Sequence, residues 1–446
     1  MDTPLLAAYD RPVPRYTSYP TAAQFTPAVG PKKHADWLRR LAGSSASLYL
    51  HVPFCQQLCW YCACHTMAMR RAGTLDAYAQ AVLGEMDLVA KQVPDLVIDS
   101  IQWGGGTPSQ LGAHRLLEIA RRVATLFDRR SDGEVSMEVD PRYCSAELVD
   151  AMAAAGVTRA SLGVQDFDET VQQAINRPQS LEVTAQALAR LRAAGIKRTN
   201  IDLVYGLPHQ TLDTLGRTLD QAIALEPDRF AVFAYAHVPW MKPHQKLIDE
   251  TALPDTAMRS AMAGLVSQRL VAARYQPVGL DHFAKPDDPL AQAAATGRLR
   301  RTFQGYVASN TSWVVGVGAS SISSLPTGYA QNVVDVAAYM AAIEEGHFAT
   351  ARGVVLCADD RLRGEIISQL MCMHEVDVAQ VCARYGASAD AFLDAIEGLS
   401  ALRCDGLVVL EDKQLTVTER GRPLLRAVCA AFDRYYRAGE GRHSRL

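Results

Sequence analysis

Short apolar runs alternate with longer helical patterns along the chain from Ser47 onward. The short runs are typical of buried strands, and the longer segments, with an apolar residue every three or four positions, are typical of amphipathic helices. Strands separated by helices of this length pair in parallel, so loops that bind ligands follow the C-terminal ends of the strands. We expect strands near residues 47–52, 97–103, 134–139, 158–164, 199–205 and 229–235, and helices near 75–93, 111–127, 145–155, 181–194 and 211–225.

The six units of strand and helix predict an α/β fold that contains a partial (β/α)6 TIM-like barrel. An incomplete barrel leaves one side open, which suits a large, flat substrate better than a closed barrel of eight strands. We assign residues 36–340 to this catalytic domain.

The segments on either side of the barrel have different patterns. The first 30 residues are rich in Pro, Tyr and Thr and lack a helical period, so we assign residues 1–35 to an extended N-terminal arm. Residues 341–446 read as a mainly helical, winged-helix-like domain with a β-hairpin at 406–418. This domain lacks a concentrated basic face, so a role in docking or as a lid is favoured over DNA binding.

The overall charge excludes some classes of partner. Lys and Arg (45) nearly balance Asp and Glu (48), so no basic field attracts a nucleic acid, and we expect none to bind. No run of about 18 unbroken apolar residues is present, so we expect no membrane span. The start of the chain, Met1-Asp2-Thr3-Pro4, lacks the pattern of a secretion signal. We therefore expect a cytoplasmic protein, and a monomer.

Four of the ten cysteines crowd into residues 55–64, with the spacing C-x3-C-x2-C-x-C directly after the first predicted strand. Clustered cysteines in a long cytosolic chain usually bind metal rather than form disulfides. Thiolates this close together can hold one iron-sulfur cluster. The other six cysteines lie mostly in apolar, helix-like surroundings, and we expect them in the core.

Two questions about this cysteine loop stay open on spacing alone. Four sulfurs would also satisfy a tetrahedral zinc ion, although zinc ligands usually come as two spaced pairs. Cys64 follows Cys62 after a single residue, which makes joint ligation of one cluster awkward. Counting residues does not decide which three cysteines are ligands.

Several polar residues follow the other predicted strands and would meet at the same end of the barrel. The segment Gly104-Gly105-Gly106 lets the backbone approach a ligand closely, although an isolated glycine run is also common in ordinary turns. Asp202 lies inside an apolar strand, a costly place unless it is paired, and a ribose hydroxyl would suit it. Taken singly, each such residue could equally serve a structural ion pair. The remaining candidates are Glu138, Asp140, Gln165, Asp166 and Arg177.

The sequence resembles the oxygen-independent coproporphyrinogen III dehydrogenases, a family of radical S-adenosylmethionine (SAM) enzymes, over nearly its whole length. The matching segments are Arg15–Thr21, the cysteine loop, Gly104–Pro108, Gly163–Phe167, Tyr205–Pro208, Tyr235–His237, Asp281–Ala284, Phe303–Tyr306 and Tyr329–Asn332. The resemblance implies the radical SAM form of the partial barrel.

The resemblance also implies a reaction. It is the oxidative decarboxylation of two propionate side chains of coproporphyrinogen III to vinyl groups, by way of a 5′-deoxyadenosyl radical. The product is protoporphyrinogen IX, a precursor of haem. An electron donor and an electron acceptor are required, and neither is identified. Arg15 in the arm is a candidate for holding a substrate carboxylate.

The resemblance further assigns residues to cofactors. Cys55, Cys59 and Cys62 would hold a [4Fe-4S] cluster, and Cys64 would be an accessory, catalytic cysteine. Two molecules of SAM are expected. Their sites would be lined by Tyr49, Gly105, Gly106, Thr107, Glu138, Gln165, Arg177, Asp202, Phe303, Gln304 and Ile322.

Two related functions compete with the decarboxylase. One is a haem chaperone with the same fold, and the other is a radical SAM methyltransferase that acts on a tetrapyrrole. Chaperone-like relatives typically lack the fourth cysteine and the arm from Arg15 to Thr21, and both are present here. The sequence therefore favours the decarboxylase.

Overall fold

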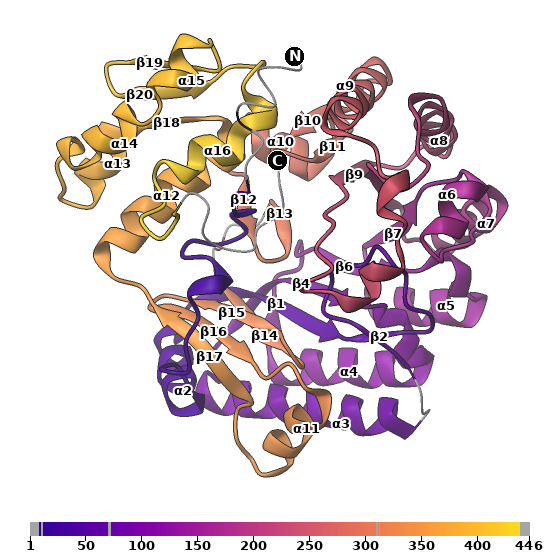
Figure 1. Cartoon of the computed structure of the whole chain (residues 1–446). Coiled ribbons are helices and arrows are strands. Elements are labelled where there is room, and N and C mark those ends of the chain that lie inside the picture. Colours follow the sequence, from indigo (N-terminus) through magenta and orange to yellow (C-terminus); the bar gives the residue numbers. More distant parts are fainter. Residues whose placement is uncertain (1–8, 10–11, 70–72, 309–310, 312, 438–446) are drawn as a thin grey trace.

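The computed structural model describes residues 9, 12–69, 73–308, 311 and 313–437. Its centre is one large sheet in the order β10-β11-β9-β8-β7-β6-β4-β1-β14-β15-β16-β17, with β5 beside β4. The six parallel strands expected from the sequence are consecutive in this sheet, which confirms the partial barrel (Figure 1). They are β1 (Ser45–Val52), β4 (Val97–Gly105), β6 (Val135–Val139), β7 (Arg159–Gln165), β8 (Arg198–Tyr205) and β9 (Arg229–Ala234).

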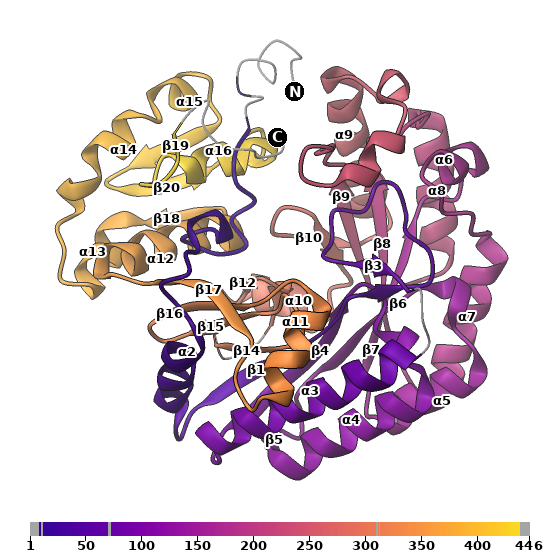
Figure 2. The same ribbon diagram turned by 60° about the horizontal axis from the view of Figure 1, so that its bottom comes forward.

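Helices cover the outer face of the parallel strands, and Figure 2 shows α3, α4 and α5 side by side along it. The core between sheet and helices contains the fully buried side chains of Tyr78, Met86, Trp103 and Phe230. The helices are α2 (Pro31–Leu38), α3 (Gly73–Gln92), α4 (Gly112–Leu126), α5 (Ala146–Ala154), α6 (Glu169–Ala174), α7 (Leu181–Ala193), α8 (Leu212–Ala224), α9 (Thr256–Ala272), α10 (Pro289–Ala295) and α11 (Val336–Glu344). Short 3-10 helices lie at Ala22–Gln24, Arg39–Leu41, Pro108–Leu111, Pro141–Tyr143, Pro243–Leu247, Glu250–Ala252, Ala389–Phe392 and Arg422–Leu424.

The sheet continues beyond the six predicted strands on both sides. The strand β14 adds parallel to β1, and the strands that follow it are antiparallel. These strands have three to six residues and contain Gly and Ser, so their hydrophobic pattern is too weak to detect in the sequence. The strands that extend this sheet are β10 (Gln276–Val278), β11 (His282–Ala284), β14 (Val314–Val317), β15 (Ile322–Leu325), β16 (Gly328–Asn332) and β17 (Thr350–Val355), and the two-residue strand β5 (Asp128–Arg129) lies beside β4. Two further pairs form small sheets of their own, β2 (Phe54–Cys55) with β3 (Met67–Ala68), and β12 (Arg300–Thr302) with β13 (Gly305–Val307).

The C-terminal domain, which begins at α12, has its own core around Phe392 and Phe432. The predicted hairpin is present as β19 and β20, and β18 pairs with the other side of β20. Because β17 still belongs to the main sheet, the division that we placed at residue 340 falls before the end of that sheet. The elements are α12 (Ala358–Met373), β18 (Glu375–Asp377), α13 (Val378–Arg384), α14 (Leu393–Glu397), α15 (Ser400–Cys404), β19 (Val408–Glu411), β20 (Gln414–Val417) and α16 (Leu425–Ala430).

The N-terminal arm lies against this C-terminal domain (Figure 1). Val13, Tyr16 and Tyr19 are buried in its core, and the Tyr16 hydroxyl donates a hydrogen bond to Asp433 Oδ2 at 3.1 Å. The helix α2 begins inside the range 1–35 that we predicted as an extended arm, because Pro31 at its start favours a helix there. No helix in the described part of the chain is both long and apolar enough to cross a membrane.

A carboxyl group is fully buried in the core between α3 and the sheet extension. Glu85 Oε2 accepts hydrogen bonds from the Gly318 amide (2.8 Å) and the Tyr339 hydroxyl (2.7 Å), and Oε1 accepts one from Asn332 Nδ2 (2.6 Å). Burial raises the pKa of Glu85 to about 7, because these three hydrogen bonds only partly offset the desolvation of the charge.

This buried carboxyl predicts a stability that falls as the pH rises. Between pH 4.5 and about 7 the folded protein keeps a proton that the unfolded chain has lost, so the contribution is complete below pH 4.5 and lost above about pH 7. Relative to Glu85→Gln, the wild type should lose up to about 3 kcal/mol of unfolding free energy between pH 4.5 and pH 8. Urea unfolding of both proteins at several pH values measures this difference. The exposed Glu147→Gln should show none, and a pH-independent difference for Glu85→Gln would contradict the prediction.

Candidate active site

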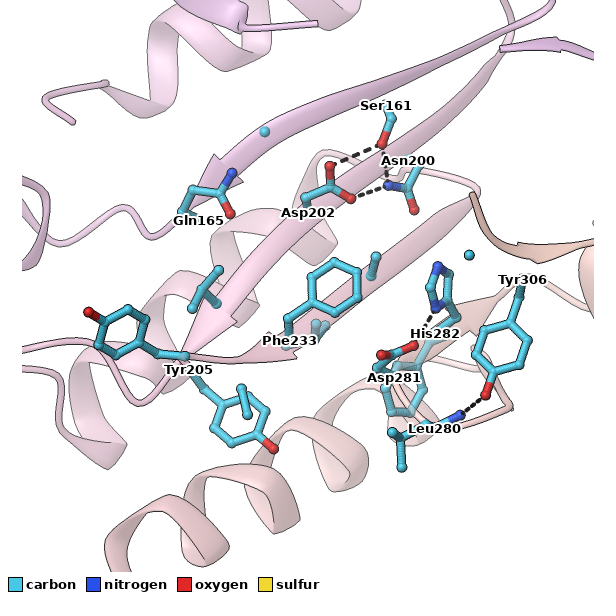
Figure 3. Close-up of a pocket in the computed structure, with 18 of the residues that line it drawn as sticks. Ser161, Gln165, Asn200, Asp202, Tyr205, Phe233, Leu280, Asp281, His282 and Tyr306 are labelled. Carbon is cyan, nitrogen blue, oxygen red and sulfur yellow. Dashed lines mark hydrogen bonds and ion pairs between the residues drawn. The ribbon is translucent and has the colours of Figure 1, made fainter. Parts of the chain in front are cut away.

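A cavity of about 1450 Å³ lies at the C-terminal ends of the parallel strands. Its wall combines these strand ends with the cysteine loop, the arm, α9 and the part of the C-terminal domain around Arg426. Figure 3 shows two carboxylates inside it, those of Asp202 and Asp281, with the Phe233 ring between them in this view. The cavity is large enough for more than one ligand, since a typical site for a single small molecule measures about 300–1,000 Å³.

The cysteine loop places four free thiols on the wall of this cavity. Cys55 Sγ lies 3.0 Å from the Thr66 hydroxyl oxygen, and Cys59 Sγ accepts a hydrogen bond from Arg177 Nη1 at 3.4 Å. A hydrogen bond from the Cys62 thiol lowers the pKa of Cys64 to about 7. Burial raises the pKa of Cys55, and the hydrogen bond to Cys64, followed by burial, raises the pKa of Cys62. The loop thus presents several sulfurs to one space, with the thiolate favoured at Cys64.

Two distant segments fix the backbone of the loop. After α6, the Ile175 carbonyl accepts from the Trp60 amide, and Asn176 Nδ2 donates to the Leu58 carbonyl, both at 3.0 Å. The second segment carries three side chains that bind three carbonyls of the loop, and we call these side chains the carbonyl clasp. Its bonds run from Gln245 Nε2 to Tyr61 O (2.8 Å), between His244 Nε2 and Cys62 O (2.7 Å), and from Lys242 Nζ to Cys64 O (2.7 Å).

The glycine segment lies at the end of β4 and contacts the start of the cysteine loop, where the Gly106 amide donates to the Val52 carbonyl at 2.8 Å. Gly105 has φ 116°, and a Cβ there would lie 2.7 Å from the His51 ring. A Cβ at Gly106 would lie 2.8 Å from the Phe54 carbonyl oxygen, so neither position accepts a side chain. The Gly105 amide donates to Glu138 Oε2 at 3.1 Å. The bare backbone is therefore packed between β1 and β6 and forms part of the cavity wall.

The carboxyl groups of the cavity differ in whether an arginine binds them, and Glu138 and Asp202 have no arginine partner among the ion pairs of the described residues. Burial, together with the nearby Cys64 and Asp202, raises the pKa of Glu138 to about 8. Burial also raises the pKa of Asp202, which accepts hydrogen bonds from Asn200 Nδ2 (2.7 Å) and Ser161 Oγ (3.1 Å), as Figure 3 shows. These two carboxyls lack a cationic partner among the ion pairs of the described chain, so they suit ligand hydroxyls or a ligand cation.

Asp140, by contrast, is bound by two arginines. Its Oδ2 lies 2.7 Å from Arg142 Nη2 and 3.2 Å from Arg177 Nη1. Although burial alone would raise the pKa of Asp140, these two guanidinium groups hold it below its ordinary value. Because Arg177 also reaches Cys59, it connects this buried ion pair to the cysteine loop.

The structure brings together most of the residues that the sequence analysis selected. Gln165 lies at a β-bulge of β7 with φ 73° and lines the cavity. Tyr49 and Ile322 are outside the lining, with the Tyr49 hydroxyl bonded to His51 Nδ1 at 3.0 Å and Ile322 paired with Gln331. The predicted residues that line the cavity are Cys55, Cys59, Cys62, Cys64, Gly105, Gly106, Thr107, Glu138, Gln165, Arg177, Asp202, Phe303 and Gln304.

The residues present fit the expected cofactors. Arg177 Nε, Asn200 Oδ1 and Gln304 Nε2 are buried polar atoms on the cavity wall, and none has a hydrogen-bond partner within the described chain. Buried polar atoms are rarely left in this state, so a ligand with both donors and acceptors would satisfy them. Cys55, Cys59 and Cys62 supply the soft ligands of an iron-sulfur cluster beside them.

The sequence analysis missed part of the cavity wall. Arg259 of α9, Arg301 of β12 and Arg426 of α16 line it, and so does Tyr205 at the end of β8. Only Arg426 carries a signal in the sequence, because it is a single charge in the apolar run from Leu424 to Ala431. Of the six cysteines expected in the core, Cys357 and Cys404 are exposed, which corrects that interpretation for these two.

Comparisons with known proteins agree with this geometry. The radical SAM superfamily model matches residues 49–222, and the HemN C-terminal domain model matches residues 356–424. The chain is 46% identical to the oxygen-independent coproporphyrinogen III oxidase of Bradyrhizobium diazoefficiens and 42% identical to that of Paracoccus denitrificans. The first comparison covers 97% of both proteins, and the second covers 98% of this chain and 97% of its relative.

The fold also matches that of a solved structure over nearly its whole length. The coproporphyrinogen III oxidase HemN from Escherichia coli, described as a radical SAM enzyme, superposes with a TM-score of 0.91 at 36% identity. The superposition covers 95% of this chain and 98% of that one. The chain therefore belongs to the radical SAM superfamily and, within it, to the family of oxygen-independent coproporphyrinogen III oxidases.

Proposed function

We propose that this chain converts coproporphyrinogen III to protoporphyrinogen IX in haem biosynthesis by oxidative decarboxylation of two propionate side chains to vinyl groups. The observation that carries the proposal is the joining of the cysteine loop, the glycine segment and a basic wall in one cavity of about 1450 Å³. The radical forms from the cofactor and must reach the tetrapyrrole, so the two ligands need one shared space.

The family uses a [4Fe-4S] cluster and SAM, which together supply a 5′-deoxyadenosyl radical when they are bound. In our assignment, Cys55, Cys59 and Cys62 hold the cluster. The buried environment of Cys59, which is 6% exposed, keeps water away from that thiol. The carbonyl clasp keeps the loop backbone in place, so the three sulfurs stay oriented toward the cavity.

The SAM-binding residues divide between two regions of the cavity, which supports the expectation of two SAM molecules. Gly105, Glu138 and Asp202 lie along the ends of β4, β6 and β8, where hydroxyl and ammonium groups of a ligand would bind. Phe303 and Gln304 lie in the turn between β12 and β13, which form a separate two-stranded sheet. We assign the first region to the SAM beside the cluster and the second to the other SAM.

Cys64 is assigned to the reaction itself and not to cluster ligation. It follows the three ligands in the loop and lines the cavity, where its carbonyl is held by Lys242. The electron donor and the electron acceptor remain to be identified, and we place the protein in the cytoplasm as a monomer.

The test is anaerobic reconstitution with iron and sulfide, followed by incubation with coproporphyrinogen III, SAM and a reductant. We expect both 5′-deoxyadenosine and protoporphyrinogen IX. The absence of both, with an intact cluster, would overturn the proposal. A methylated tetrapyrrole would instead support a methyltransferase, and haem binding without SAM cleavage would support a chaperone.

A further inference from the structure

Four arginines from four separate segments line one region of the active-site cavity. We call Arg15, Arg259, Arg301 and Arg426 the arginine cluster; they come from the arm, α9, β12 and α16 respectively. Asp281 lies among them, and Figure 3 shows its hydrogen bond with His282 (2.7 Å). Arg420, Arg422 and Glu419 of the C-terminal domain also line the cavity.

The positive charges of the cluster exceed its negative charge. Burial alone would raise the pKa of Asp281. The hydrogen bond from His282 and the positive charges of His282, Arg301 and Arg15 outweigh this effect and lower the pKa to about 2. Burial, and then repulsion by Arg15, lowers the pKa of Arg426 to about 10. Arg426 is buried, Arg259 and Arg301 are partly buried, and Arg15 is exposed. Guanidinium groups that repel one another in this way are stabilised by any anion that enters between them.

The local geometry directs these groups into the cavity. Tyr16 has φ 47°, a conformation that is unfavourable for a tyrosine, and its buried side chain points into the C-terminal domain. Its neighbours Arg15 and Thr17 consequently face the cavity. Arg426 Nη1 donates to the Val13 carbonyl at 3.3 Å, so the arm and α16 meet at the cluster.

Arg301 is also held in place before any ligand binds. Its guanidinium lies 4.4 Å from the centre of the Tyr306 ring, which is itself fixed by hydrogen bonds of its hydroxyl with Met371 O (2.7 Å) and the Leu280 amide (3.0 Å). The Nε atom of Arg301 is buried and has no hydrogen-bond partner in the described residues. A stacked guanidinium with an open donor is suited to binding a carboxylate.

A coproporphyrinogen has four propionates, and two of them remain carboxylates throughout the reaction. We propose that the arginine cluster binds the propionates that are not at the reaction centre, and that it thereby turns the reacting propionate toward the cysteine loop. This inference rests on the function proposed above. A single SAM carboxylate would require only one bidentate arginine, whereas two or more propionates account for a cluster of four.

The test measures how strongly the protein distinguishes charged from uncharged tetrapyrroles. Coproporphyrin III and its tetramethyl ester, in the same buffer with a non-ionic detergent, are titrated by fluorescence against the reconstituted protein. We expect the wild type to bind the tetra-acid much more tightly than the ester. Arg15→Gln and Arg259→Gln should each weaken binding of the acid about tenfold and leave ester binding unchanged.

Matched variants separate recognition from folding. Arg15→Lys should restore part of the affinity, because it keeps the charge but loses bidentate geometry. Arg40→Gln and Arg403→Gln remove exposed arginines outside the cavity and should bind both compounds as the wild type does. SAM affinity and cluster content should be unchanged in Arg15→Gln and Arg259→Gln. The KM for coproporphyrinogen III should rise in these two variants, by more than kcat falls.

The outcomes distinguish this inference from the function on which it rests. Equal affinity of the wild type for acid and ester, or unchanged discrimination in both glutamine variants, would overturn the inference even if the enzyme forms protoporphyrinogen IX. Strong discrimination that the variants lose, without any turnover by the wild type, would support the cluster as a polycarboxylate site and overturn the decarboxylase.

Discussion

The Cys59→Ser variant is expected to leave anaerobic reconstitution without its [4Fe-4S] cluster and without activity. Cys59 is buried on the cavity wall and accepts a hydrogen bond from Arg177, so no other sulfur replaces it at that position without moving the loop. A serine hydroxyl stays protonated near neutral pH and is a poor ligand for iron. Iron per chain and 5′-deoxyadenosine formation should both fall, the latter at least about a hundredfold.

Cys64→Ser is the matched control within the same loop. If Cys64 is not a ligand, this variant keeps the iron content and the cluster spectrum of the wild type but loses decarboxylation. Cys404→Ser, which changes an exposed cysteine outside the cavity, should alter neither property. A Cys59→Ser protein that retains a full cluster, or a Cys64→Ser protein that loses it, would show that the ligands have been assigned incorrectly.

Gly105→Ala is expected to abolish the reaction through a steric conflict rather than through lost chemistry. The added Cβ would lie 2.7 Å from the His51 ring, and three contacts prevent that ring from moving away. They are the hydrogen bonds of His51 with the Tyr49 hydroxyl (3.0 Å), the His65 carbonyl (3.1 Å) and the Ser320 hydroxyl (3.2 Å). The cavity wall between β1 and β6 must therefore shift, and we expect SAM affinity to fall at least about tenfold.

Gly195→Ala provides the control for backbone conformation. Gly195 also has a positive φ (88°), but its Cβ would have no neighbour within 4 Å. The Gly195→Ala variant should lose only about 1 kcal/mol of unfolding free energy and bind SAM as the wild type does. Isothermal titration with SAM, combined with thermal unfolding, separates the two effects. Equal SAM affinity in Gly105→Ala and the wild type would rule out the tight contact at His51.

The regular part of the fold could be predicted from the sequence because its signals are local. Each predicted parallel strand agrees with the structure to within about two residues, since short apolar runs alternate regularly with longer amphipathic helices. The cysteine loop and the glycine segment were placed at adjacent strand ends for the same reason, and β1 does pair with β4. Parallel pairing was enough to bring these two motifs into one site.

The rest of the site depends on contacts between residues that are far apart in the sequence. Lys242 and His244 bind carbonyls of the cysteine loop about 180 residues earlier. No pattern within either segment reveals these contacts. Arg259 and Arg301 lie in segments whose charges look like ordinary surface residues. Their role becomes visible only when the chain folds, because it arises from the position of α9 and β12 around the cavity.

The contacts of the arm imply an order of events during synthesis. Residues near both ends of the described chain meet: the Tyr436 hydroxyl donates to the Pro12 carbonyl at 3.1 Å, and the Tyr9 hydroxyl donates to Asp405 at 2.6 Å. A ribosome therefore releases the barrel and its four thiols well before α16 exists to bind the arm. Because domains generally fold as they emerge, the barrel with its cysteine loop can fold before the part of the cavity wall formed by the arm and α16 is in place. The wall of the cavity is therefore complete only after α16 has been synthesised and the arm has packed against it.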